Sequence, residues 1–255
     1  MIKLSNINMN YKGKQILEDI NLEIKTGEIM VIIGPSGSGK STLLRLIVGL
    51  LKPTSGEIYI DGQEITQLSE TELNQIRLRM GMVFQYSALF DSMTVGDNVA
   101  FGLRQHTKMT EDEIAKVVSR KLRMVGLFGK EDTMPNELSG GMKKRVSLAR
   151  AIAVNPEIVL YDEPTAGLDP IMSGKIDRLI TSTRRIMGVT SVVVTHHMSS
   201  AFNIADRIAM IYGGKIIELG TVEEFKQSKN PIVQQFIHGE KTPGLLARRR
   251  GKTEC

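Results

Sequence analysis

The feature that most constrains the fold is a run of eight residues, Gly34-Pro35-Ser36-Gly37-Ser38-Gly39-Lys40-Ser41, which matches the pattern G-x-x-x-x-G-K-[ST]. It follows the almost wholly apolar stretch 28–33 and precedes residues 43–50, which are rich in leucine. This order predicts a buried strand, a glycine-rich loop and a helix, as in folds that bind phosphates. Glycines let backbone N–H groups turn inward around an anion, and the helix start adds a favourable field. The alternative interpretation is a glycine-rich turn that binds nothing.

Individual side chains of this loop have expected roles at a nucleotide. Lys40 would reach the β- and γ-phosphates, and the Ser41 hydroxyl would ligate Mg²⁺. The residues predicted to bind the nucleotide are Gly34, Pro35, Ser36, Gly37, Ser38, Gly39, Lys40, Ser41 and Thr42.

A second apolar run, residues 158–161, ends in two acids, Asp162 and Glu163. Carboxylates at the C-terminal end of a core strand face the crevice in which α/β sheets bind ligands. Asp162 is expected to hold Mg²⁺, directly or through water, and Glu163 to orient and deprotonate an attacking water. Adjacent strand residues point to opposite faces, so the two acids can take separate roles. On its own the motif also fits an ordinary strand end.

The remaining pattern predicts an α/β sheet core that is interrupted by a helical insertion. Two S/T-x-x-E capping boxes, at Ser69 and Thr110, predict helix starts, and residues from about 87 to 150 are mostly helical in pattern. A later helix is expected to open at Asp169-Pro170 and to stop at Gly188. Strands are expected at 20–25, 28–33, 57–60, 158–161, 191–195 and 207–212, with a tight hairpin turn at Asp61-Gly62.

Composition excludes several classes of protein. Hydrophobic residues make up 41% and charged residues 24%, which is close to the globular average and excludes disorder over the whole length. No stretch approaches the ~20 apolar residues of a membrane-spanning helix, and the N-terminal residues have no apolar core of a secretory signal. The single cysteine, Cys255, allows no disulfide within the chain and fits a reducing compartment.

The net charge of +5 is concentrated near the end of the sequence. Residues 241–255 hold five basic side chains and one acidic side chain, which leaves +1 for the first 240 residues. Nucleic-acid binding usually needs a basic patch on the folded domain, so no nucleic-acid partner is expected. The basic segment 242–250 could contact anionic lipid, clasp a neighbouring subunit or remain a solvated end.

Over residues 1–230 the chain resembles the ATP-binding-cassette (ABC) ATPases, because their motifs occur in their order. After the phosphate loop come Gln85 behind a strand, Leu138-Ser139-Gly140-Gly141-Met142, the Asp162-Glu163 strand, 166–169 and His196. The resemblance implies an α/β fold: a P-loop NTPase (RecA-like) core with an antiparallel β subdomain and an inserted α-helical subdomain. It implies an ATPase domain at 1–240, with its core at 1–86 and 151–240, a helical subdomain at about 87–150, and a flexible basic tail at 241–255.

The resemblance also implies that ATP and Mg²⁺ bind between two copies of the chain arranged head to tail. Ser139, Gly140 and Gly141 offer a hydroxyl, close approach and a helix N-terminus, and would bind the γ-phosphate of ATP held by the partner. Asp169 would cross the dimer interface. For the first three residues, a plain helix N-cap with a glycine-lined turn is the alternative.

Three further residues match family positions. Gln85 matches the glutamine that senses the γ-phosphate and Mg²⁺; its alternative is a polar strand end. His196 matches the switch histidine that contacts the γ-phosphate and helps to position water, so Glu163, His196 and Gln85 form the expected catalytic set. Tyr11 matches the aromatic residue that stacks on adenine, with a core tyrosine as the alternative.

Two residues depart from the family pattern. Met142 stands where glutamine is commonest, so the resemblance implies the loss of a polar contact near the partner's nucleotide. His197 follows the switch histidine where aspartate is commoner, and we expect it to be solvated and without a role.

Since no membrane segment is found, the resemblance implies a separate integral membrane permease, with this ATPase peripheral at the cytoplasmic side of the bacterial inner membrane. Residues 84–99 and 139–145 resemble the ATPase of Mla-type phospholipid transporters, which implies phospholipid transport between membranes and an MCE-domain lipid-binding partner. The alternatives are the ATPase of a small-molecule importer, such as one for amino acids, and a soluble ABC protein. The apolar residues expected to line a groove for a permease helix, or else to pack in the core, are Tyr86, Leu89, Phe90 and Met93.

Overall fold

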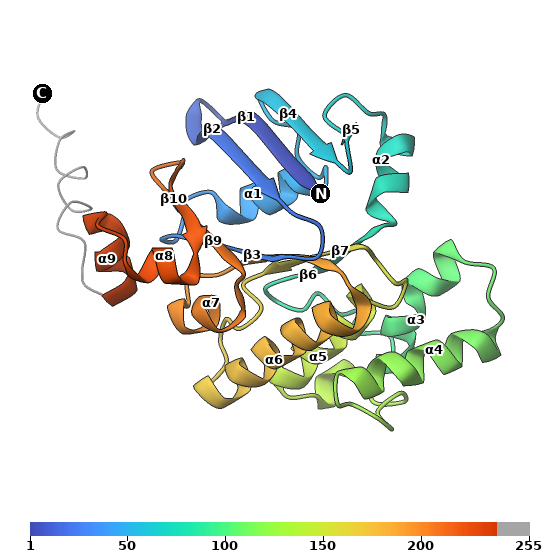
Figure 1. The fold of residues 1–255 in the computed structure, drawn as a ribbon. Helices are drawn as coiled ribbons and strands as arrows, with labels where there is room; N and C mark the ends of the chain where they lie inside the picture. The colour runs from blue at the N-terminus through green and yellow to red at the C-terminus, as the bar shows by residue number, and fades with distance from the viewer. Residues whose placement is uncertain (239–255) are drawn as a thin grey trace, which may run out of the picture.

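The computed structural model describes residues 1–238, and a six-stranded sheet runs through their centre (Figure 1). The strand order is β10-β9-β3-β8-β7-β6, and every neighbouring pair is parallel except β9 and β10. The strands are β3 (Ile29–Ile33), β6 (Met80–Val83), β7 (Ile158–Asp162), β8 (Thr190–Val194), β9 (Arg207–Tyr212) and β10 (Lys215–Thr221).

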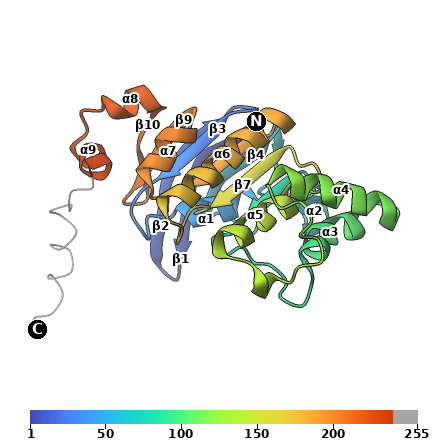
Figure 2. The same ribbon diagram turned by 90° about the horizontal axis from the view of Figure 1, so that it is seen from below.

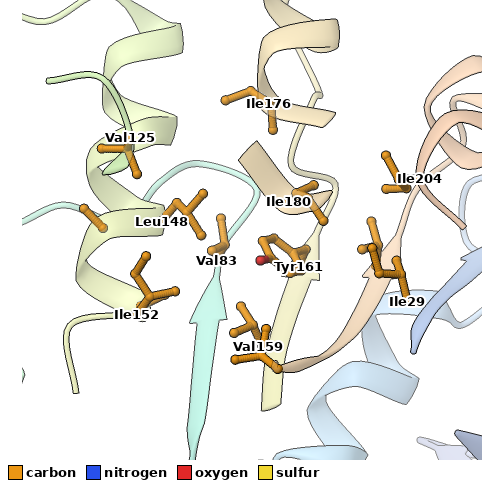
Figure 3. Packing of buried hydrophobic residues seen from close by; sticks show 14 of the residues in the cluster. Ile29, Val83, Val125, Leu148, Ile152, Val159, Tyr161, Ile176, Ile180 and Ile204 are labelled. Carbon is orange, nitrogen blue, oxygen red and sulfur yellow. The ribbon is translucent and has the colours of Figure 1, made fainter. Parts of the chain in front are cut away.

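The inner strands of this sheet are apolar because both of their faces are covered. In β3, Met30 and Ile32 pack in the cluster that contains helix α1 (Lys40–Ile47), whereas Val31 and Ile33 pack in the cluster on the opposite face. Alternate residues of a strand point to opposite faces, so a strand covered on both sides needs apolar residues at every position. Figure 3 shows the second cluster, in which Tyr161 of β7 lies beside Ile180.

A smaller antiparallel sheet lies on the far side of α1, so that this helix is enclosed between the two sheets (Figure 1). Its strand order is β2-β1-β4-β5. Asp61 and Gly62 join β4 and β5 with φ angles of 48° and 83°, which confirms the predicted hairpin turn. The strands are β1 (Ile2–Tyr11), β2 (Lys14–Ile24), β4 (Ser55–Ile60) and β5 (Gln63–Glu64).

Most helices between β6 and β7 lie at one end of the sheet, and α5 also covers part of its lower face (Figures 1 and 2). Both predicted capping boxes are present: Ser69 caps α2 and Thr110 caps α4. The segment boundaries expected at 87 and 150 stay predictions. The elements are α2 (Glu70–Arg77) before β6, then α3 (Val95–His106), α4 (Glu111–Met124), the 3₁₀ turn η1 (Pro135–Glu137) and α5 (Gly140–Ala151).

Helix α6 (Pro170–Met187) covers the lower face beside α5 (Figure 1). Asp169 Oδ1 accepts a hydrogen bond from the backbone N–H of Met172 at 2.9 Å, and Gly188 ends the helix with φ 70°. Both predicted ends of this helix are therefore confirmed. The remaining helices are α7 (Met198–Ile204), α8 (Val222–Lys226) and α9 (Pro231–His238).

No helix within residues 1–238 combines the length and the apolar character needed to cross a membrane. The predicted basic tail at 241–255, with Cys255, lies outside the described residues.

Candidate nucleotide-binding and hydrolysis site

The phosphate loop connects β3 to α1 and is packed so closely that two of its positions admit only glycine. Gly34 has φ +151°, and a Cβ there would lie 2.2 Å from the carbonyl oxygen of Ile211. Gly39 has φ +102°, and a Cβ there would lie 2.6 Å from Leu17 Cδ2. The neighbouring strands β2 and β9 therefore fix the path of the loop, which accounts for two of the glycines in the sequence motif.

The start of α1 is left open to a ligand. Its N-cap residue is Gly39, which has no side chain to accept hydrogen bonds from the first turn. The hydroxyl of Ser38 is buried and has no hydrogen-bond partner among residues 1–238. Free N–H groups at a helix start, next to an unpaired buried hydroxyl, form a site that an anion can complete.

Lys40 bends back over this loop. Its Nζ donates hydrogen bonds to the carbonyl oxygens of Gly34 at 2.9 Å and Pro35 at 3.1 Å, and lies 4.0 Å from Glu163 Oε1. Burial lowers the pKa of Lys40, an effect that the charges of Glu163 and Asp162 oppose. A phosphate anion would supply stronger acceptors for this ammonium group than the two neutral carbonyls.

The start of α1 and the end of β7 bring an alcohol and a carboxylate together. Ser41 Oγ donates a hydrogen bond to Asp162 Oδ1 at 2.8 Å, across 121 residues of sequence. Both are hard oxygen donors, the kind that Mg²⁺ prefers, and Mg²⁺ usually takes few protein ligands and fills its other positions with water and phosphate oxygens. The residues present therefore fit Mg²⁺ bound together with a nucleotide.

Glu163 directly contacts His196, which follows the end of β8. Glu163 Oε2 accepts a hydrogen bond from His196 Nδ1 at 2.9 Å, and the His196 backbone N–H points to the same oxygen at 3.4 Å. The carboxylate can only accept, so Nδ1 carries the proton in this arrangement. Glu163 also has φ +48°, an unusual angle for a residue with a side chain.

The expectation that His197 is solvated is wrong. The residue is half-buried, and its Nδ1 lies within hydrogen-bond distance, 3.2 Å, of the hydroxyl of Thr165, which is fully buried. Its ring packs edge-on against that of His196, with centroids 4.3 Å apart. Sequence spacing could not show this, because Thr165 and His197 come from different loops that meet only when β7 and β8 pair.

The glycine pair lies at the start of α5. Ser139 caps this helix by accepting a hydrogen bond from Met142 N–H at 3.3 Å, so the N-cap interpretation holds in the isolated chain. Ser139 and Gly140 are exposed, whereas Gly141 is buried, and a Cβ there would lie 2.5 Å from Met172 Cε at the start of α6. Asp169 is exposed one turn before that methionine. The starts of α5 and α6 therefore meet at one surface.

Tyr11 lies at the end of β1 and leaves 59% of its surface exposed, so the core-tyrosine alternative is wrong. The following strand, β2, contains Leu17, which packs against Gly39 of the phosphate loop. The hairpin that carries Tyr11 is therefore attached to the phosphate loop through β2.

Gln85 and the residues after it are held by cations on α5 that the sequence did not identify. Lys144 Nζ donates to the carbonyl oxygen of Gln85, and Arg150 donates to the carbonyl oxygens of Ala88 at 2.7 Å and Ser87 at 3.1 Å. Burial lowers the pKa of Lys144, while the charges of Asp162 and Glu163 raise it, so this ammonium group lies near both acids. In the sequence, Lys144 is only one of several basic residues on this helix, and that pattern does not show that its side chain is buried.

Comparison with known proteins identifies the family of this chain. Residues 17–166 match the family model described as ABC transporter. The intermembrane phospholipid transport system ATP-binding protein MlaF of Haemophilus influenzae is 45% identical, over 94% of this chain and 91% of that protein. The methionine import ATP-binding protein MetN of Carboxydothermus hydrogenoformans is 46% identical, over 93% of this chain and 72% of that protein.

Solved structures agree with the sequence relatives. A dimeric ATP-binding cassette in a post-hydrolysis state, bound to ADP and Pi, superposes with a TM-score of 0.81. It is 39% identical and covers 87% of this chain and 99% of its own. Together with the phosphate loop and the paired acids, these matches show that the chain belongs to the ABC transporter family and is an ATP-hydrolysing ATPase.

Proposed function

We propose that this chain binds MgATP at the phosphate loop and hydrolyses it to energise phospholipid transport between membranes. The observation that carries the proposal is the convergence of five side chains where β3, β7 and β8 end. There Ser41 contacts Asp162, and Lys40 and His196 both approach Glu163.

Each group at the site has one task in binding. The N–H groups at the start of α1 and the Ser38 hydroxyl hold the phosphates, and Lys40 exchanges its two carbonyl partners for phosphate oxygens. Ser41 and Asp162 would hold Mg²⁺, with Gln85 as a further oxygen ligand. The metal ion would supply positive charge that offsets the charge of the phosphates. Tyr11 supplies an exposed aromatic face for adenine.

Glu163 and His196 act on the attacking water. The Glu163 carboxylate accepts the proton of the water, and His196 orients it toward the γ-phosphate. Their mutual hydrogen bond holds the two side chains next to each other.

A second copy of the chain completes the site. The exposed start of α5, with Ser139 and Gly140, has unpaired N–H groups that fit the γ-phosphate on a neighbouring copy. Asp169 lies beside it at the same surface, which fits contact across a head-to-tail interface. The dimeric state of the structural relatives supports this arrangement.

A hollow of about 470 Å³ fits a helix of a membrane permease. Its lining includes Phe101, Met82 and Arg150 but none of the four predicted groove residues. Of those four, Tyr86 and Phe90 are 87% and 41% exposed. The other two predicted groove residues, Leu89 and Met93, are half-buried, and Leu89 packs against the core.

The names of several relatives support phospholipid as the cargo. MlaF proteins of two bacteria are 45% and 41% identical to this chain, and the printed name of both is intermembrane phospholipid transport system ATP-binding protein. By this proposal the chain works with a permease and an MCE-domain lipid-binding protein, at the cytoplasmic face of a bacterial inner membrane. The second candidate is amino-acid import, which the similarity to a methionine import protein favours.

The test of ATP hydrolysis is the variant Glu163→Gln, with the exposed Glu223→Gln as matched control. Removing a general base lowers the turnover rate by about 10²- to 10⁴-fold while ATP affinity is retained. ATP affinity is measured by nucleotide fluorescence and turnover by phosphate release. Unchanged turnover in Glu163→Gln would remove this residue from the reaction.

The test of cargo uses the chain purified with its permease and placed in lipid vesicles. Transfer of a labelled phospholipid that stops in the Glu163→Gln complex supports the proposal. ATP-dependent accumulation of labelled methionine without lipid transfer supports the second candidate.

A further inference from the structure

His197 is held at three points. Thr165 Oγ1 and His197 Nδ1 lie 3.2 Å apart, and the backbone N–H of His197 donates to Thr195 Oγ1 at 3.0 Å. The His197 carbonyl oxygen accepts from Ala201 N–H at 3.0 Å in the first turn of α7. Both the ring and the main chain of this residue are therefore fixed.

The ring of His197 meets that of His196 edge to face. The centroids lie 4.3 Å apart and the planes make an angle of 69°. Such contacts restrict the orientation of both rings. Since 44% of the His196 side chain is exposed, few other contacts limit its rotation. His197 and Glu163 are thus the two side chains that restrict the ring of His196.

Thr165, whose hydroxyl contacts the His197 ring, belongs to the turn that follows Glu163. In this turn Ala166 N–H donates to the carbonyl oxygen of Glu163 at 3.1 Å, and Leu168 N–H donates to that of Thr165 at 3.2 Å. The turn leads directly to Asp169 at the start of α6. A displacement of this turn is consequently passed to His197 through the Thr165 hydroxyl.

We propose that His197 is a positioning residue for hydrolysis: it holds the His196 ring against Glu163 and ties that ring to the turn from Glu163 to Asp169. The inference rests on the proposed ATP hydrolysis at Glu163 and His196. In this role His197 acts through the ring of His196. Its loss leaves ATP binding intact and lowers the rate of the chemical step.

The experiment compares four variants of the full chain: His197→Ala, His197→Phe, Thr165→Val and the double variant His197→Phe/Thr165→Val. His238→Ala, at the exposed end of α9, is the matched control. His197→Ala is expected to lower kcat by about tenfold with KM for ATP within about twofold, since only the transition state uses the positioned ring.

The remaining variants test the path of the effect. His197→Phe keeps the ring and recovers part of kcat. Thr165→Val lowers kcat in the natural chain but adds nothing in His197→Phe, because both changes remove the same hydrogen bond. Equal kcat in His197→Ala and the natural chain overturns the inference, as does a matching loss of ATP affinity or strictly additive effects.

The proposed function is followed separately in the same assays through Glu163→Gln. If Glu163→Gln is inactive while His197→Ala is fully active, only the inference fails. If the natural chain and Glu163→Gln release phosphate equally, the proposed function fails as well. Should His197→Ala not fold, as judged by its thermal midpoint, His197→Phe and Thr165→Val decide the question alone.

Discussion

Glu163 occupies a backbone conformation that residues with side chains rarely adopt. A non-glycine residue in the left-handed region costs on the order of 1 kcal/mol and persists only where its surroundings enforce it. Here the Glu163 N–H donates to the carbonyl oxygen of Val194 at 2.9 Å, and its own carbonyl oxygen accepts from Ala166. The strained angle directs the carboxylate toward His196 and Lys40 rather than along the strand.

Lys121 is a second residue in an unfavourable position, because its surroundings disfavour the charged form of its side chain. It is 2% exposed on α4, and its Nζ donates to Asn155 Oδ1 at 2.7 Å, which joins the helical segment to the loop before β7. Burial lowers the pKa of Lys121 to about 8, and the charge of Arg120 adds to the effect. The folded chain therefore binds this proton less tightly than the unfolded chain.

The variant Lys121→Met tests this cost. Below pH 8 both states are protonated and the folded state bears the full penalty, on the order of 3 kcal/mol for a pKa displaced from 10.5 to about 8. Between pH 8 and 10.5 the folded state releases the proton first, so the natural chain gains stability relative to Lys121→Met. Urea unfolding at pH 7 and pH 10 measures the difference, and a difference that stays constant contradicts the assignment.

The loop between β6 and α3 depends on one buried amide. Asn98, in the second turn of α3, is fully buried. Its Oδ1 accepts from Phe90 N–H at 2.8 Å, and its Nδ2 donates to the carbonyl oxygens of Phe90, Met93 and Thr94 at 3.0 to 3.2 Å. Together with Arg150 this amide fixes a loop that contains two residues with positive φ, Ser87 and Ala88.

The change Asn98→Asp keeps the shape of the side chain but replaces its donors with an oxygen. Buried carbonyls that lose their donors cost about 1–3 kcal/mol, and more when they face a charge. We expect a clear fall in the urea midpoint and faster amide hydrogen exchange at residues 87–94. The exposed Asn74→Asp on α2 serves as control and leaves both unchanged. If residues 87–94 are as well protected from exchange in Asn98→Asp as in the natural chain, the loop is ordered without the Asn98 amide.

Elements with local signals could be predicted from the sequence, whereas this loop could not. The capping boxes at Ser69 and Thr110, and Gly188 at the end of α6, act within one helical turn of the residues they cap. Lys144 and Gln85, in contrast, are 59 residues apart, and His197 and Thr165 are 32 apart. No spacing rule links such pairs, since their contact exists only after the sheet has ordered its strands.

The order of the strands in the central sheet explains which parts of the site could be predicted from the sequence. β3, which precedes the phosphate loop, is next to β8 and β9, and β8 separates it from β7. The carboxyl ends of parallel strands meet at one edge, so the strand ends predicted from Ser41, Asp162 and His196 had to converge there. The sequence pattern could not rank the inner strands within the sheet, because β3, β7 and β8 are all short and largely apolar.

Mixing two inactive variants tests the assembly of the whole molecule. Ser139→Arg fills the exposed start of α5, and Lys40→Ala removes the ammonium group of the phosphate loop; each alone abolishes hydrolysis in a head-to-tail dimer. In a mixed dimer one site combines the intact loop of the first with the intact α5 of the second. An equal mixture is therefore expected to regain up to about a quarter of natural activity, measured by phosphate release. A mixture as inactive as its components would show that each site lies within one chain.

The pairing of β6 with β7 has a consequence for how such chains can vary. Val83 is the register partner of Tyr161, and Met80 is that of Ile158, so the excursion of residues 84–157 leaves at the carboxyl end of β6 and rejoins at the amino end of the neighbouring parallel strand. Lengthening or shortening that excursion shifts neither strand against the other. Insertions and deletions within residues 84–157 can thus change the segment proposed to contact a membrane protein, while the phosphate loop, Asp162 and Glu163 keep their positions.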